Sequence, residues 1–151
     1  MTFVVPFDGS DLASAALARA SEFGDALDQP VLAVTVVPTG NAAYARERGW
    51  LGADEPFDVE SVVASLRDRV ATIAPDADFE HAVVERYASS GTIAREIRTM
   101  ARREDASMVF VGSEHAGNIV SSVSSVGGSV SAEHAYDVVV VLNPARSLAE
   151  M

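Results

Sequence analysis

Apolar and polar residues follow one another in a pattern that predicts strands alternating with helices. Residues 3–7 and 31–37 are continuous apolar runs, as expected for strands that are covered on both faces of a sheet. Three other segments repeat their apolar residues at the spacing of a helix. These positions are Leu12, Ala16, Ala20, Phe23 and Leu27; Val59, Val62, Val63, Leu66, Val70 and Ile73; and Ile93, Ile97, Met100 and Ala101.

Three more apolar segments, residues 79–86, 107–111 and 138–142, complete the predicted set of strands. Because helices separate the strands through most of the chain, we expect a parallel sheet with helices on both faces. Residues 1–146 are predicted to form this single α/β domain, and residues 147–151 a short C-terminal tail.

Two of the predicted strands end in polar, glycine-containing sequences. Asp8-Gly9-Ser10 follows the first strand, where Ser10 or Asp11 can cap the next helix, and Gly112-Ser113 follows the fourth. In parallel sheets, ligands bind outside the carboxyl ends of the strands, where the strand order reverses. If these two strands are neighbours, their ends form a polar crevice for a small molecule.

The segment between the fourth and fifth strands is rich in small residues, and residues 109–141 contain four glycines and seven serines. Gly127 and Gly128 interrupt a helical spacing, so we expect a broken helix before a short helix that Ser129 can cap. Backbone N–H groups at such a helix start can bind phosphate without a cation. A surface loop is the alternative interpretation, and the residues alone leave both open.

The connection over residues 38–57 has no regular apolar period. A connection of this length is typical of a functional, mobile or partly helical segment. Its Tyr44 and Trp50 can form a lid or a partner contact, or they can pack partly into the core.

Composition excludes several kinds of function. The chain of 151 residues has a net charge of −11, its 11 basic residues are all arginine, and it has no cysteine. Without lysine there is no Walker-type phosphate loop and no Schiff base. An acidic surface disfavours nucleic acid and anionic membranes, and no apolar run approaches the roughly 20 residues of a membrane span. Such a surface suits a salt-rich cytoplasm, so we expect a halophilic protein. The absence of cysteine makes the cytoplasm the expected location.

No catalytic or metal-binding constellation stands out in the sequence. The G-x-S-x-G elbow of many hydrolases is absent. His134 and Asp137 are spaced by one helical turn, but two ligands are too few for a metal site. We therefore predict no metal and no assigned catalytic residue.

Four stretches taken together resemble the universal stress protein family. They are VVPFDGS near the N-terminus, SSGTIAREI before the third helix, MVFVGS at the fourth strand and GGSVSAEHAYDVVVV at the end. The likeness covers essentially the whole chain. It implies a doubly wound fold with strand order 3-2-1-4-5, a regulatory role in the stress response and, in some members, a site for ATP.

The resemblance also implies contacts for an adenine nucleotide. Pro6 and Asp8 correspond to positions at the adenine, although Asp8 can equally serve only to cap the first helix. Val36 corresponds to the strand residue whose backbone meets adenine. The full set of expected contacts is Pro6, Asp8, Val36, Val111, Gly112, Ser113, Gly117, Gly127, Gly128 and Ser129.

The phosphate motif of the ATP-binding members is altered in this chain. Those members carry Gly, two residues, Gly, nine residues and then Gly-Ser/Thr. Gly112 fits the first position, but His115 and Ser125 stand at the second and third. Gly128-Ser129 fits the final pair only if the preceding loop is three residues longer than in the motif. The motif is therefore remodelled or degraded.

The last strand is the expected site of self-association. Family members often form homodimers by pairing their last strands, and an apolar, uncharged edge strand is a liability unless something covers it. The pairing residues are expected to be Val138, Val139, Val140, Val141 and Leu142.

Two functions remain open. One is a stress-response regulator with an ATP crevice at the ends of the first and fourth strands, with at most weak ATP hydrolysis. The other is a dimeric interaction module that recognises a protein client and binds no nucleotide.

Overall fold

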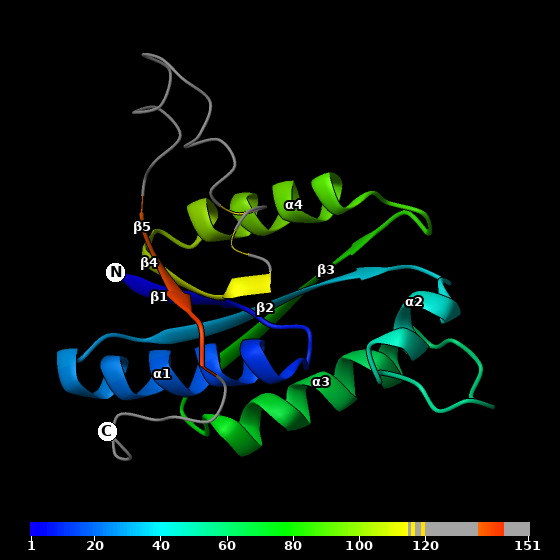
Figure 1. Ribbon diagram of the computed structural model, residues 1–151, viewed down its shortest axis with the longest axis horizontal. Helices are drawn as coiled ribbons and strands as arrows, with labels where there is room; N and C mark the ends of the chain where they lie inside the picture. The colour runs from blue at the N-terminus through cyan, green and yellow to red at the C-terminus, as the bar shows by residue number, and fades with distance from the viewer. Residues whose placement is uncertain (115, 117–118, 120–135, 144–151) are drawn as a thin grey trace, which may run out of the picture.

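A five-stranded parallel sheet organises the chain in this computed structural model, which describes residues 1–114, 116, 119 and 136–143 (Figure 1). The strand order is β3-β2-β1-β4-β5, which confirms the predicted order 3-2-1-4-5. The strands are β1 (Thr2–Pro6), β2 (Val31–Pro38), β3 (Asp78–Val84), β4 (Ala106–Gly112) and β5 (Asp137–Val141). Because β1 lies between β2 and β4, the chain reverses its direction of winding on either side of β1.

Four helices lie wholly within the described residues, and three of them follow the predicted apolar stripes. They are α1 (Asp11–Leu27), α2 (Ala42–Glu47), α3 (Val59–Ile73) and α4 (Ser90–Arg103). The helices α1 and α3 cover one face of the sheet and α4 covers the other (Figure 1). Ser10, rather than Asp11, caps α1, because its side chain accepts a hydrogen bond from the backbone of Ala13 at 3.2 Å.

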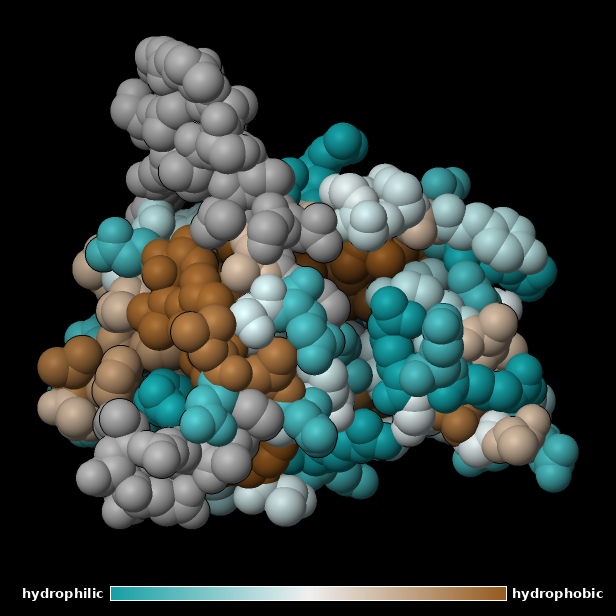
Figure 2. All heavy atoms as spheres, viewed as in Figure 1, coloured by the Kyte–Doolittle hydropathy of each residue, from teal (hydrophilic) through white to brown (hydrophobic). Residues whose placement is uncertain are grey.

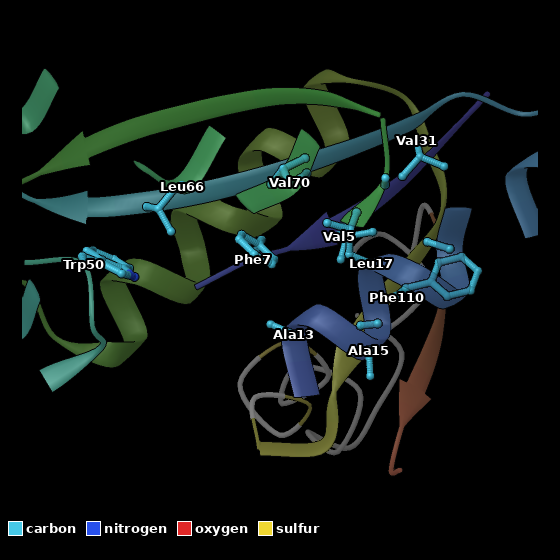
Figure 3. Close-up of a cluster of buried hydrophobic side chains, with 14 of the residues drawn as sticks. Val5, Phe7, Ala13, Ala15, Leu17, Val31, Trp50, Leu66, Val70 and Phe110 are labelled. Carbon is cyan, nitrogen blue, oxygen red and sulfur yellow. The ribbon is translucent and has the colours of Figure 1, made fainter. Parts of the chain in front are cut away.

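The hydrophobic core has two layers, one on each face of the sheet. Between the sheet and α1 and α3, Val5, Leu17, Leu66 and Phe110 are buried together (Figure 3). The opposite layer packs Val4, Val34, Val109 and Val111 against Met100 and Ala101 of α4. Neighbouring residues of β1 and β2 point into opposite layers, which explains why these strands are apolar throughout.

The two edges of the sheet differ in character. At one edge is β3, which alternates exposed residues such as His81 with half-buried ones. At the other is β5, where Val140 is 42% exposed and Leu142, just beyond the strand, is 75% exposed. A hydrophobic area lies over β5 in the space-filling view (Figure 2). Within the described residues, β5 pairs only with β4.

None of the helices in the described part of the chain is long and apolar enough to cross a bilayer.

Candidate functional site

A cavity of about 280 Å³ lies at the carboxyl ends of the two central strands β1 and β2. The end of β1 contributes Pro6, Phe7 and Asp8, and β2 contributes Val34 to Val36. One wall is the apolar face of α4, with Ile93, Ala94 and Ile97. The opposite wall comes from the segment that carries α2, through Tyr44, Arg48 and Trp50. The cavity is therefore apolar on one side and polar on the other.

The turn after β1 has a fixed geometry. Asp8 accepts a hydrogen bond through Oδ1 from the backbone N–H of Ser10 at 2.9 Å. Between them Gly9 has a φ of 83°, a conformation that side chains disfavour. A Cβ on Gly9 would also lie 2.5 Å from Nη1 of Arg69. The Asp8-Gly9-Ser10 sequence thus turns the chain from β1 into α1 and leaves Asp8 at the cavity.

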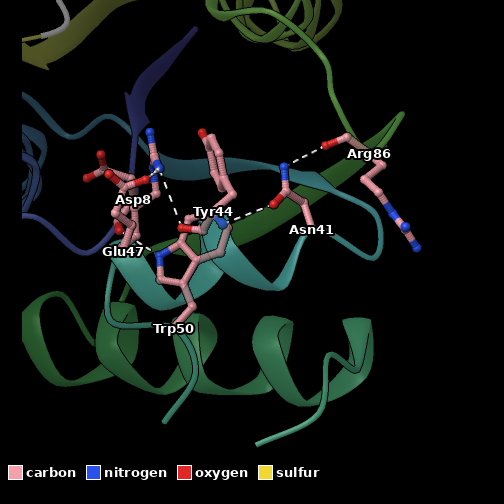
Figure 4. Close-up of polar contacts among 7 residues, drawn as sticks. Asp8, Asn41, Tyr44, Glu47, Trp50 and Arg86 are labelled. Atoms are coloured by element: carbon pink, nitrogen blue, oxygen red, sulfur yellow. Dashed lines mark hydrogen bonds and ion pairs between the residues drawn. The ribbon is translucent and has the colours of Figure 1, made fainter. Parts of the chain in front are cut away.

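Two side chains hold the backbone carbonyls at the end of β1. Thr35, which is 2% exposed, donates from Oγ1 to the carbonyl of Phe7 at 2.6 Å. Trp50 donates from Nε1 to the carbonyl of Asp8 at 2.7 Å (Figure 4). Because buried carbonyls are costly to leave unpaired, these contacts order the chain where Asp8 enters the cavity.

The segment between β2 and α3 is folded against the sheet. Asn41 caps α2 by accepting from the backbone of Tyr44 at 3.0 Å, and it donates from Nδ2 to the carbonyl of Arg86 at 2.7 Å (Figure 4). The rings of Tyr44 and Trp50 meet edge to face, with 5.6 Å between their centroids. Trp50 is only 4% exposed and belongs to the main core, so its role is core packing together with a hydrogen bond to the site.

Arg48 and Tyr44 form a stacked pair on the polar wall. The guanidinium carbon of Arg48 lies 3.4 Å from the centroid of the Tyr44 ring. Burial raises the pKa of the Tyr44 phenol above its ordinary value, and the charges of Asp8 and Glu47 add to the rise while Arg48 opposes it. The phenol therefore keeps its proton and can donate a hydrogen bond.

The structure brings some of the sequence-predicted site residues together and separates others. Pro6, Asp8 and Val36 all line the cavity described above. Val111 is buried in the α4 layer, and Gly112 and Ser113 follow it at the end of β4, but none of the three lines the cavity. The predicted contacts Gly117, Gly127, Gly128 and Ser129 lie outside the described residues.

The strands β1 and β4 are neighbours as expected, and the ends of β1 and β2 line the cavity together with Ile119, which follows β4 in the chain. Gly112, at the end of β4, packs against the first turn of α1. A Cβ on Gly112 would lie 2.8 Å from Cβ of Leu12 and 3.1 Å from its carbonyl carbon. In the described residues, the glycine at the end of β4 serves close packing between a strand and a helix.

Thr35, Arg48 and the α4 residues line the cavity and were not predicted from the sequence. Their spacing is the sequence signal that could have identified Tyr44 and Arg48 as a pair, because residues four apart share a helix face. Without a regular apolar period around them, that spacing did not reveal a short helix. Among the described residues, no group of three or more histidines or carboxylates could hold a metal ion.

Comparisons with known proteins agree with the fold and with the motifs. The model of the universal stress protein family matches residues 1–142. A universal stress protein crystallised in complex with cAMP is 22% identical, with a TM-score of 0.54, and the match covers 93% of this chain and 96% of that one.

Two further solved structures have the same fold. A family member from Burkholderia pseudomallei is 18% identical, with a TM-score of 0.58 and coverage of 94% and 96%. A universal stress protein from Archaeoglobus fulgidus is 17% identical, with a TM-score of 0.54 and coverage of 93% for both chains. No curated protein matches the sequence. The family match spans nearly the whole chain, and the chain belongs to the universal stress protein family.

Proposed function

We propose that the chain is a stress-response regulatory protein that binds an adenine nucleotide in the cavity at the ends of β1 and β2. One observation carries this proposal: Pro6, Asp8 and Val36, which the family resemblance marks as adenine contacts, come from two strands and line a single cavity. The cAMP complex of a protein with the same fold supports an adenine nucleotide as the ligand class.

The size and lining of the cavity suit a base and its sugar. Its volume of about 280 Å³ lies just below the range of roughly 300–1,000 Å³ for small-molecule sites. Ile93, Ile97 and Val36 offer apolar walls for a planar base, and the carboxylate of Asp8 can accept hydrogen bonds from ribose hydroxyls. A nucleoside monophosphate fits these features, and ATP requires further contacts for its outer phosphates.

The apolar edge of β5 favours a second candidate function. In this alternative, the chain is a dimeric interaction module that binds no nucleotide and presents its surface to a protein client. The exposed Val140 and Leu142 are the specific observation. Pairing of β5 with its counterpart in a second copy would cover this edge. Self-association through β5 is compatible with both functions, so ligand binding decides between them.

Calorimetric titration with AMP and ATP at high KCl concentration tests the proposal. We expect saturable binding of AMP by the native chain. Replacing Ala88, a half-buried residue at the cavity, by tryptophan should fill the space and abolish binding. Ala71→Trp, on the exposed side of α3, is the matched control and should bind as the native chain does. A folded native chain that releases no heat with either nucleotide would support the interaction module.

A further inference from the structure

We propose that Arg48, held against Tyr44, binds the phosphate of the nucleotide and makes the cavity selective for nucleotides over nucleosides. This inference rests on the proposed nucleotide site and assigns a ligand-binding role to a residue of the segment between β2 and α3. It places a phosphate contact on the wall opposite α4 and outside the glycine-serine segment.

The charge of the cavity is the first argument. Of the described residues that line it, only Asp8 and Arg48 carry charge. The chain as a whole has a net charge of −11, and a phosphate entering beside the Asp8 carboxylate would be repelled. The positive charge of Arg48 offsets the negative charge of Asp8, so the described lining of the cavity has no net charge. Because the chain has no lysine, an arginine is the residue that can supply this cation.

The second argument is that most donors of Arg48 are not used within the described part of the chain. Its polar contacts there are long, at 3.5 Å from Nη1 to the carbonyl of Tyr44 and 4.0 Å from Nη1 to Glu47. The Glu47 side chain is 80% exposed, so water screens that ion pair. A guanidinium presents several N–H donors in a planar fork that matches phosphate oxygens. Arg48 is therefore able to bind an anion without breaking a strong existing contact.

The third argument is that the guanidinium is held in place before a ligand arrives. The Tyr44 ring supports it at 3.4 Å, and the Arg48 side chain is only 30% exposed. Tyr44 is in turn fixed by its contact with Trp50 and by the cap from Asn41. A group held in its binding position loses less conformational entropy when the ligand binds. The neutral Tyr44 hydroxyl provides another donor on the same wall.

Comparing the binding of AMP and adenosine tests this role directly, since the two ligands differ only in the phosphate. Charge-assisted hydrogen bonds contribute about 1.5–3 kcal/mol, so we expect Arg48→Gln to weaken AMP binding by about 10- to 100-fold. Adenosine lacks the phosphate that Arg48 is proposed to bind, so its affinity should change by less than about twofold. Arg48→Lys keeps the charge without the planar fork and should give an intermediate AMP affinity.

Arg67→Gln is the matched control. Arg67 lies on α3 with its guanidinium 5.4 Å from the centroid of the Phe79 ring, and it does not line the cavity. This variant removes the same charge and a comparable aromatic contact, so it should bind both ligands as the native chain does. Circular dichroism melts of all variants should show native folding.

Three outcomes would overturn the assignment. If Arg48→Gln weakens AMP and adenosine equally, Arg48 only shapes the cavity. If it weakens neither, the phosphate is bound elsewhere. If the native chain binds neither ligand, the proposed nucleotide site itself fails, and the role of Arg48 fails with it.

Discussion

At the scale of single residues, polar groups near the cavity are fixed by short local contacts. Thr35 and Trp50 each hold one carbonyl at the end of β1, and Arg48 rests on an aromatic ring. The contacts of Thr35 with Phe7 and of Trp50 with Asp8 join residues far apart in the sequence, whereas Arg48 and Tyr44 are four residues apart. A sequence shows that such residues exist, but their partners depend on how the elements pack.

Glu80 on β3 offers a test of electrostatics at the same scale. Its Oε2 lies 3.7 Å from Nη2 of Arg103, and its side chain is 39% exposed. Burial is the largest cause that raises the pKa of the Glu80 carboxyl. A hydrogen bond with Glu104 and the negative charge of Glu104 raise this pKa further, while Arg103 lowers it. A raised pKa means that the folded chain favours the protonated carboxyl.

The folded chain therefore gains stability from the proton on Glu80. This contribution to the free energy of unfolding is complete below the unfolded pKa of about 4.3, and it is lost as the pH rises through the folded pKa. Glu80→Gln mimics the protonated form. We expect it to be more stable than the native chain at about pH 7, by a few tenths of a kcal/mol given solvent screening. This advantage should disappear near pH 4, as measured by urea unfolding. Glu85→Gln is the control, and equal pH dependence for the native chain and both variants would refute the prediction.

At the scale of elements, apolar periodicity was sufficient for the regular parts of the fold. The stripes of α1, α3 and α4 and the runs of β1 and β2 predicted the layered sheet. The connection between β2 and α3 resisted prediction, because α2 has six residues and is stabilised by Asn41 and by tertiary contacts. A helix this short has little intrinsic stability of its own.

The same limit applied to the candidate site. The turn at Asp8 could be predicted, since a strand end followed by glycine and serine is a local signal. The wall formed by Tyr44 and Arg48 could not, because it depends on how an irregular segment folds back on β1. Gly112 packs closely against α1, a role that the sequence alone did not indicate, and its predicted ligand contact stays a prediction.

Packing between β4 and α1 predicts the effect of substituting Gly112. A Cβ at 2.8 Å from Cβ of Leu12 forces the strand or the helix to move, so Gly112→Ala should lower the free energy of unfolding by about 1–3 kcal/mol. Gly91→Ala is the control, because its Cβ would meet only Oγ of Ser89 at 3.7 Å. We expect that variant to be neutral or up to about 1 kcal/mol more stable, since alanine favours a helix. Equal urea midpoints for Gly112→Ala and the native chain would contradict this packing argument.

At the scale of the whole molecule, the two edges of the sheet provide a matched comparison. Val140 on β5 and Val83 on β3 are 42% and 47% exposed. We propose that β5 pairs with β5 of a second copy, so Val140→Glu should convert a dimer into a monomer, because charge on an edge strand opposes pairing. Val83→Glu should leave the dimer intact. Light scattering during gel filtration measures both, and a monomeric native chain or a dimeric Val140→Glu variant would rule out pairing through β5.

The central claim is that an adenine nucleotide occupies the cavity at the ends of β1 and β2. The most direct measurement is an NMR titration of ¹⁵N-labelled chain with AMP, in which the indole N–H of Trp50, the only tryptophan, is a unique reporter. We predict saturable shifts of this resonance and of the backbone amides of Asp8, Val36 and Ala94. A separate hollow at the end of α1 is lined by Gly24, Asp25 and Asp28, among other residues. Unchanged resonances at Trp50, Asp8, Val36 and Ala94, or shifts confined to that hollow, would contradict the claim.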